Sequence, residues 1–260
     1  MNLIKHKDSQ GNYYEFSELK NSPTTIFIHG VGLDNTMWYP QKKYFHNHSV
    51  LFYDLLNHGQ SSGGFKELNY EVYNDQLINL INVLGIKKVN IVGFSIGAII
   101  AQHFTEKYFE KVNKLVLIGS VYQRSDKQIE TVQKRYIDAC NGKSITIDSI
   151  KRWFSESYLD NHPDVYDFFY NLLERKKNED FLPAYKIFVN SDKYLINYSN
   201  FNMPSLIMTG ENEIGSTPLM SEGISKEIKN SNLFIIKNAK HGATIEQSNV
   251  VNEKLNKFLF

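Results

Sequence analysis

A serine between two glycines, in Gly93-Phe94-Ser95-Ile96-Gly97, is the segment of this 260-residue chain that most directly indicates chemistry. A serine hydroxyl is a weak nucleophile at neutral pH, and it needs an adjacent base and donors for the oxyanion. In this motif the serine occupies a strained turn between a strand and a helix, where the flanking glycines avoid backbone clashes. Residues 88–92 predict a buried strand, and residues 96–108 predict a helix. We therefore predict that Ser95 is a catalytic nucleophile.

The candidate base is a histidine near the end of the chain. Of eight histidines, only His241 lies beyond the strand predicted at 204–209. It sits in a loop between a predicted strand, 232–236, and the last predicted helix. With this serine motif the partners follow in the order serine, acid, histidine. A loop at the carboxyl edge of a parallel sheet can reach a nucleophile at that edge, so we predict that His241 is the base.

The candidate acid is a carboxylate that follows a strand. The predicted strand 204–209 runs into Gly210-Glu211-Asn212-Glu213. A carboxylate at this point can accept the imidazole N–H, fix its tautomer and stabilise the imidazolium. We prefer Glu213, with Glu211 and Asp126, which follows the preceding strand, as alternatives.

Backbone N–H groups are the candidate oxyanion donors. One is the N–H of the residue after the nucleophile, Ile96, and the second comes from the loop that follows an earlier strand. That loop is His29-Gly30-Val31-Gly32, in which we favour the N–H of Val31, with Gly32 as the alternative. For His29 itself we expect a buried imidazole that holds the loop by hydrogen bonds.

These residues require a parallel sheet to position them. Continuous apolar runs predict buried strands, and residues 70–84 carry apolar side chains at helical spacing, with Gly85 placed to end the helix. Residues 3–17 read as a hairpin whose turn is Asp8-Ser9-Gln10-Gly11. Strands that alternate with helices in this way indicate an α/β fold. The strands are predicted at 24–28, 50–53, 88–92, 114–118, 204–209 and 232–236.

The alternation stops between residues 121 and 200, where the chain reads as helical and rich in aromatic residues. Candidate helices there span 126–139, 148–158 and 163–176. We expect an α/β core of residues 1–120 and 201–260, interrupted by a helical cap, 121–200, that serves as a substrate lid.

Composition narrows the function classes. A net charge of +1 gives no reason to expect nucleic acid or an anionic membrane surface as a partner. The single cysteine, Cys140, excludes an intramolecular disulfide, and no metal-binding or complete nucleotide-binding motif occurs, so we expect no metal and no cofactor. Because neither a signal-like N-terminus nor an 18-residue apolar run is present, we expect a cytoplasmic protein. The oligomeric state, including a homo-oligomer, stays open.

The motifs together resemble the α/β-hydrolase superfamily with a helical cap. The resemblance rests on the His29 loop with Trp38, on Asp54-Leu55-Leu56-Asn57-His58-Gly59-Gln60-Ser61, on the Ser95 motif and on the His241 loop, and it covers nearly the whole chain. It implies a mostly parallel central sheet with helices on both faces. More narrowly, three stretches resemble the 3-oxoadipate enol-lactonase branch: Arg152-Trp153-Phe154, Phe181-Leu182-Pro183-Ala184-Tyr185, and Thr209 to Pro218.

The branch resemblance implies a small ester or lactone substrate that carries a carboxylate, with Arg152 and Trp153 near it. The family pattern usually has Asp where this chain has Glu213. Because Glu is one methylene longer, either the imidazole or its loop must shift slightly, or another acid serves. We expect hydrolysis through an acyl-enzyme. The alternatives are a C–C bond hydrolase, a cofactor-free haloperoxidase or perhydrolase, and a catalytically silent binding protein. Gly242 counts against a C–C bond hydrolase, because those enzymes usually have Trp directly after the base.

Overall fold

The sheet that positions the site has eight strands in the order β1-β2-β4-β3-β5-β6-β7-β8. The computed structural model describes residues 3–19 and 22–260. The first two strands form an antiparallel hairpin, and β2 pairs antiparallel with β4, while all later neighbours are parallel. The strands are β1 (Ile4–Lys7), β2 (Tyr13–Ser17), β3 (Thr24–Ile28), β4 (Val50–Tyr53), β5 (Val89–Phe94), β6 (Val112–Ile118), β7 (Ser205–Gly210) and β8 (Ser231–Ile236). The prediction of a mostly parallel α/β sheet is confirmed.

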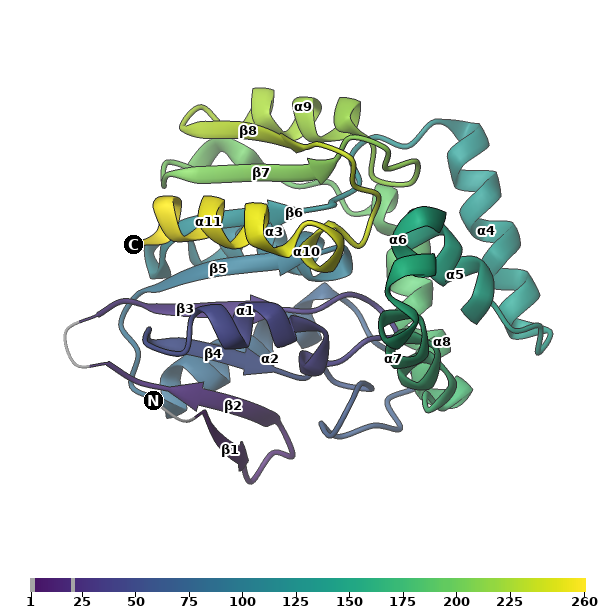
Figure 1. The fold of residues 1–260 in the computed structure, drawn as a ribbon. Helices are drawn as coiled ribbons and strands as arrows, with labels where there is room; N and C mark the ends of the chain where they lie inside the picture. The colour runs from purple at the N-terminus through teal and green to yellow at the C-terminus, as the bar shows by residue number, and fades with distance from the viewer. Residues whose placement is uncertain (1–2, 20–21) are drawn as a thin grey trace.

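Helices cover both faces of this sheet (Figure 1). One face packs against α2 (Tyr70–Val83), α3 (Ile96–Tyr108) and α9 (Pro218–Glu227). The other packs against α1 (Tyr39–Tyr44) and α11 (Ser248–Leu259), which follows the short α10 (Ala243–Glu246). Strands β3, β4 and β5 are buried along their whole length. In these three strands, a continuous apolar run in the sequence corresponds to a strand that helices cover on both faces.

Local signals placed several element ends correctly. The turn of the first hairpin is held by Asp8, whose Oδ1 accepts hydrogen bonds from the N–H groups of Gln10 and Asn12. Gly85 follows α2 with φ of +65°, a backbone conformation that costs glycine little. Both predictions are confirmed.

A helical insertion separates β6 from β7 and lies beyond the carboxyl ends of the strands (Figure 1). It consists of α4 (Asp126–Cys140), α5 (Thr146–Trp153), α6 (Glu156–Asn161), α7 (Pro163–Glu174) and α8 (Asn178–Val189). Short 3₁₀ turns lie at Asn35–Trp38, Phe109–Lys111, Ser191–Lys193 and Tyr198–Asn200. The carboxyl edge of the sheet is thus covered by residues that the sequence pattern assigned to the insertion.

Two helices of the insertion differ from the prediction. The single helix expected at 148–158 is broken, because Phe154 is extended (φ −126°, ψ 151°) and Ser155 begins a new helix. Helix α8 was not predicted. It contains Pro183 in its first turns, a residue that usually argues against a helix interior.

Within the described ranges, no helix combines the length and the apolar character needed to cross a membrane.

Candidate active site

Ser95 stands at a strained turn between β5 and α3. Its φ of 56° and ψ of −120° are a conformation that non-glycine residues rarely adopt. Its N–H donates to the carbonyl of Ile118 on the neighbouring strand, 2.9 Å away, which fixes the turn to the sheet. A Cβ on Gly93 would lie 2.3 Å from the carbonyl oxygen of Gly97, and one on Gly97 would lie 2.4 Å from that of Ile28. Both glycines are therefore required by the close approach of backbone.

His241 and Glu213 make a close polar contact beside this turn. The distance from His241 Nδ1 to Glu213 Oε2 is 2.6 Å, and both side chains are buried. The His241 ring also packs against Phe94, with ring centroids 4.8 Å apart. Gly119, with φ of +61°, makes room for it, since a Cβ there would come within 3.3 Å of His241 Cε1. The ring is held on three sides, so its orientation is fixed.

Glu213 is held in its ionised form. Burial alone would raise the pKa of this carboxyl, but His241, Arg152 and the N–H of Gly215 lower it to about 2. Oxygen Oε1 accepts hydrogen bonds from the N–H groups of Gly215 and Ser216. These two donors anchor one oxygen of the longer glutamate, which leaves the other free to meet the imidazole.

The two alternative acids lie elsewhere. Glu211 is on the surface, where it pairs with Lys237 at 2.6 Å and accepts from the N–H of Asn238. Asp126 is exposed in the first turn of α4. Of the three candidates from sequence, the structure brings Glu213 to His241.

Two backbone N–H groups near Ser95 have no acceptor among the described residues: those of Val31 and Ile96. Ile96 is the first residue of α3, where the N–H groups lack partners within the helix and the helix dipole favours negative charge. The N–H of Gly32, the alternative donor, is already donated to His58 Nε2 at 3.1 Å. The geometry therefore favours Val31 over Gly32.

The expectation for His29 is confirmed. Its imidazole is fully buried, with Nδ1 2.8 Å from the carbonyl oxygen of Gly30 and Nε2 accepting from the N–H of Leu55 at 3.0 Å. His58 packs against it, with ring centroids 5.1 Å apart. Burial lowers the pKa of His29 to about 4 and that of His58 to about 3. Sequence reasoning missed the role of His58, although it stands in a quoted motif.

Ser95, His241 and Val31 line one pocket, which also receives side chains from the insertion. Its volume is about 550 Å³, including the part open to solvent. Arg152 and Trp153 of α5 both line it, as the resemblance implied. Trp153 lies with its ring centroid 6.3 Å from that of His241, and its indole N–H is buried without a partner.

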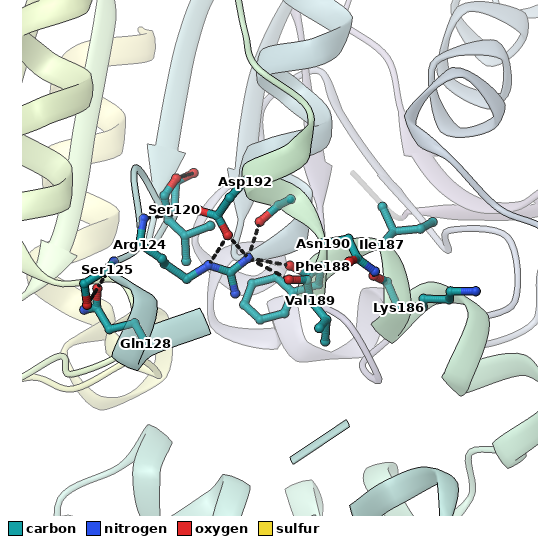
Figure 2. A network of polar contacts seen from close by, with 12 residues as sticks. Ser120, Arg124, Ser125, Gln128, Lys186, Ile187, Phe188, Val189, Asn190 and Asp192 are labelled. Atoms are coloured by element: carbon teal, nitrogen blue, oxygen red, sulfur yellow. Dashed lines mark hydrogen bonds and ion pairs between the residues drawn. The ribbon is translucent and has the colours of Figure 1, made fainter. Parts of the chain in front are cut away.

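Two further arginines in this pocket, Arg124 and Arg135, were missed from sequence. Arg124 is nearly buried and donates to Asp192, to two carbonyls and to Ser191 (Figure 2). It ties the start of the insertion to its end. The amino-acid composition could have drawn attention to both, because the chain has only four arginines but 25 lysines.

The insertion is fastened to the His241 loop through Glu246. This buried carboxylate accepts from the N–H and hydroxyl of Ser155 and from the N–H of Lys240. Next to it, the N–H of Gly242 donates to the carbonyl of Trp153 at 2.7 Å. No sequence signal pointed to Glu246, because Ser155, its partner on the insertion, is 91 residues away in the chain.

Within residues 3–19 and 22–260, no cluster of three or more His, Cys, Asp or Glu side chains could hold a metal ion.

Comparison with known proteins agrees with this architecture. The family model described as alpha/beta hydrolase fold matches residues 23–248. The (E)-2-((N-methylformamido)methylene)succinate hydrolase of Acinetobacter baylyi is 26% identical over 251 residues, which are 95% of this chain and 93% of that protein. The 3-oxoadipate enol-lactonase 2 of the same species is 21% identical, with 93% and 90% covered.

Among solved structures, the enol-lactonase from Burkholderia xenovorans LB400 superimposes with a TM-score of 0.84 at 19% identity, covering 95% of this chain and 96% of that one. This similarity concerns the fold alone. The strand order, the helices on both faces and the family match over most of the chain lead to one conclusion: the chain belongs to the alpha/beta hydrolase fold family.

Proposed function

We propose that this protein is a serine hydrolase that cleaves a carboxylic ester or an (enol-)lactone of a small organic substrate through an acyl-enzyme. The observation that carries the proposal is the 2.6 Å contact between Glu213 and His241 in the pocket that contains Ser95. A buried carboxylate, an oriented imidazole and a serine on a strained turn are the parts that acyl transfer requires.

In the acylation step, Ser95 Oγ attacks the ester carbonyl and His241 Nε2 takes its proton, because Nδ1 is engaged with Glu213. Negative charge develops on the carbonyl oxygen. The free N–H groups of Val31 and Ile96 would receive it. His241 then gives its proton to the leaving oxygen, which departs from an ester or stays attached to the acyl chain of a lactone.

In the deacylation step, water replaces the leaving group. His241 takes a proton from the water as its oxygen attacks the acyl carbon, and returns it to Ser95 as the acid product is released. Glu213 remains ionised throughout and stabilises the imidazolium in both steps.

The helical insertion, 121–200, would serve as the substrate lid over this site. Arg152 and Trp153 are the proposed substrate contacts, because both line the pocket and have buried N–H groups without partners. A guanidinium in this position favours a substrate that carries a carboxylate. Two relatives support a small acidic substrate, since their names specify a substituted succinate and a 3-oxoadipate enol-lactone.

Replacing the nucleophile tests the proposal. We expect Ser95→Ala to lower the hydrolysis of a simple aryl ester by at least about 10³-fold and to abolish labelling by a fluorophosphonate probe, because the attacking oxygen is gone. Wild-type protein and the variant are compared by ester turnover, by probe labelling and by thermal unfolding.

Ser221, which is buried on α9 away from the pocket, is the matched control. S221A should keep turnover and labelling. Full activity in a folded S95A variant would refute the assignment. A panel of esters, enol-lactones, C–C bond substrates and peracid formation separates hydrolysis of esters from the other reactions that such a triad can support.

A further inference from the structure

The few arginines of this protein are concentrated at one place. Three of the four, Arg124, Arg135 and Arg152, line the pocket that contains Ser95, and the fourth, Arg175, is exposed on the insertion. No lysine of residues 3–19 or 22–260 lines it. Arginine binds carboxylates with two parallel N–H groups in a fixed plane, which lysine cannot do. The choice of side chain therefore points to recognition of carboxylate.

One of the three is already neutralised. Arg124 forms an ion pair with Asp192 at 2.7 Å and donates to the carbonyls of Phe188 and Val189 (Figure 2). The charge of Arg124 is therefore balanced within the protein, and its contacts hold the pocket wall in place. The charges of Arg135 and Arg152 need a separate explanation.

Arg135 and Arg152 have no such partner. Neither has a carboxylate within 4 Å or a hydrogen bond to any described residue, and the Nε atom of each is buried and unsatisfied. They come from different helices, Arg135 from α4 and Arg152 from α5. Burial and the charge of Arg135 lower the pKa of Arg152 to about 10, which reflects the cost of holding two cations together.

No carboxylate of the described residues forms an ion pair with either of them. The described residues that line the pocket include no Asp or Glu. The nearby Glu213 is engaged with His241 and with the N–H groups of Gly215 and Ser216. The pocket therefore holds two guanidinium groups without an ion-pair partner, and Glu213 offsets the charge of Arg152 only in part, because the pKa of Arg152 stays lowered.

We propose that the substrate carries two free carboxylates besides the ester or lactone group, one bound by Arg152 and the other by Arg135. The inference rests on the proposed hydrolase function and specifies its substrate class. Two guanidinium groups on separate helices match two anionic groups, whereas a single carboxylate would leave one positive charge unbalanced.

An outer cavity gives such a substrate access. It adjoins the Ser95 pocket, shares Arg135, Arg152, Tyr185 and Gly215 with it, and also contains Asp138, Asp148 and Lys143. The two arginines therefore stand in the wall between the outside and the nucleophile, where they can meet an entering anion.

Matched esters test the inference. The substrates are ethyl propionate, monoethyl succinate and a monoethyl ester of propane-1,2,3-tricarboxylic acid, which carry zero, one and two free carboxylates. We expect kcat/KM of the wild type to rise by about 10-fold or more with each carboxylate, as charge-assisted pairs with arginine would give. In R135Q the ratio between the diacid and the monoacid should fall to about one, and R135K should restore part of it.

R175Q is the control, because it removes the one arginine outside the pocket. It should keep all three wild-type values. A wild-type enzyme with no preference for the diacid, or an R135Q variant that keeps the wild-type ratio, would overturn the inference.

A binding measurement separates this inference from the proposed function. Calorimetric titration of S95A with glutarate and with butyrate should show at least about 10-fold tighter binding of glutarate, lost in S95A/R135Q. If no ester is hydrolysed but this difference is found, the hydrolase proposal fails and the dianion site stands. If a neutral ester is hydrolysed and glutarate binds no better than butyrate, the dianion site fails and the hydrolase proposal stands.

Discussion

At the residue scale, the separate contacts of the two carboxylate oxygens explain how Glu213 can serve where the family usually has aspartate. Oε1 is fixed by the N–H groups of Gly215 and Ser216, so Oε2 reaches His241 without displacing the imidazole from the pocket. The acid therefore depends on backbone donors that lie two and three residues further along the chain.

Replacing this carboxylate should impair catalysis more than binding. We expect Glu213→Gln to lower kcat by about 10³-fold or more, because the amide no longer stabilises the imidazolium or fixes its tautomer. KM should change much less. Both constants are measured with the best ester from the panel.

Glu211→Gln is the matched control, since Glu211 lies in the same loop but pairs with Lys237 on the surface. It should retain wild-type kcat. A large loss of kcat in E211Q together with a small loss in E213Q would show that Glu213 is not the acid.

At the element scale, the hydrogen bonds of Glu246 connect the insertion to the His241 loop. Its carboxylate satisfies donors from Ser155 on the insertion and from Lys240 in the loop. The break between α5 and α6, which the sequence pattern did not show, presents Ser155 to this carboxylate.

Removing the connection should destabilise the protein. We expect Glu246→Ala to lower the free energy of unfolding by about 2 to 4 kcal/mol, because buried donors lose a charged acceptor. Urea unfolding followed by circular dichroism measures the change. E253A, at an exposed position on the adjacent α11, should stay within about 0.5 kcal/mol of the wild type, and an equal loss in the two variants would argue against the connection.

At the scale of the whole molecule, buried neutral histidines make stability depend on pH. The pKa of His29 is lowered to about 4 and that of His58 to about 3, mainly by burial. Between these values and the ordinary 6.5, the unfolded chain binds protons that the folded chain does not. The stability that the neutral pair provides is therefore complete above about pH 6.5 and is lost as the pH falls toward 4.

We expect the free energy of unfolding to fall between pH 7 and pH 5 by up to about 1.4 kcal/mol per pH unit for each such histidine. His58→Gln should reduce this slope, because one of the groups that titrate only on unfolding is gone. Urea titrations at several pH values give the slope. H6Q, at an exposed histidine on β1, should leave it unchanged, and an H58Q variant with the wild-type slope would contradict the account.

The sequence alone determined the sheet and the two residues that follow most directly from it. Ser95 and His241 could be placed because Ser95 directly follows the buried β5 and His241 lies in the loop after β8, and the carboxyl ends of parallel strands meet at one edge. Only one of the six residues of β8 is buried, since this strand lies at the edge of the sheet. The apolar runs that mark those strands are local patterns, readable without any knowledge of distant contacts.

Tertiary structure decided the rest. Glu213, Glu211 and Asp126 all follow strands, and only the packing of their loops determined which carboxylate meets His241. The directions of Arg135 and Arg152 depend on how α4 and α5 are set against the sheet, which helical periodicity within the insertion does not contain. A strand end fixes the position of its own next residue, whereas the lining of a pocket between elements is fixed by contacts between segments far apart in the chain.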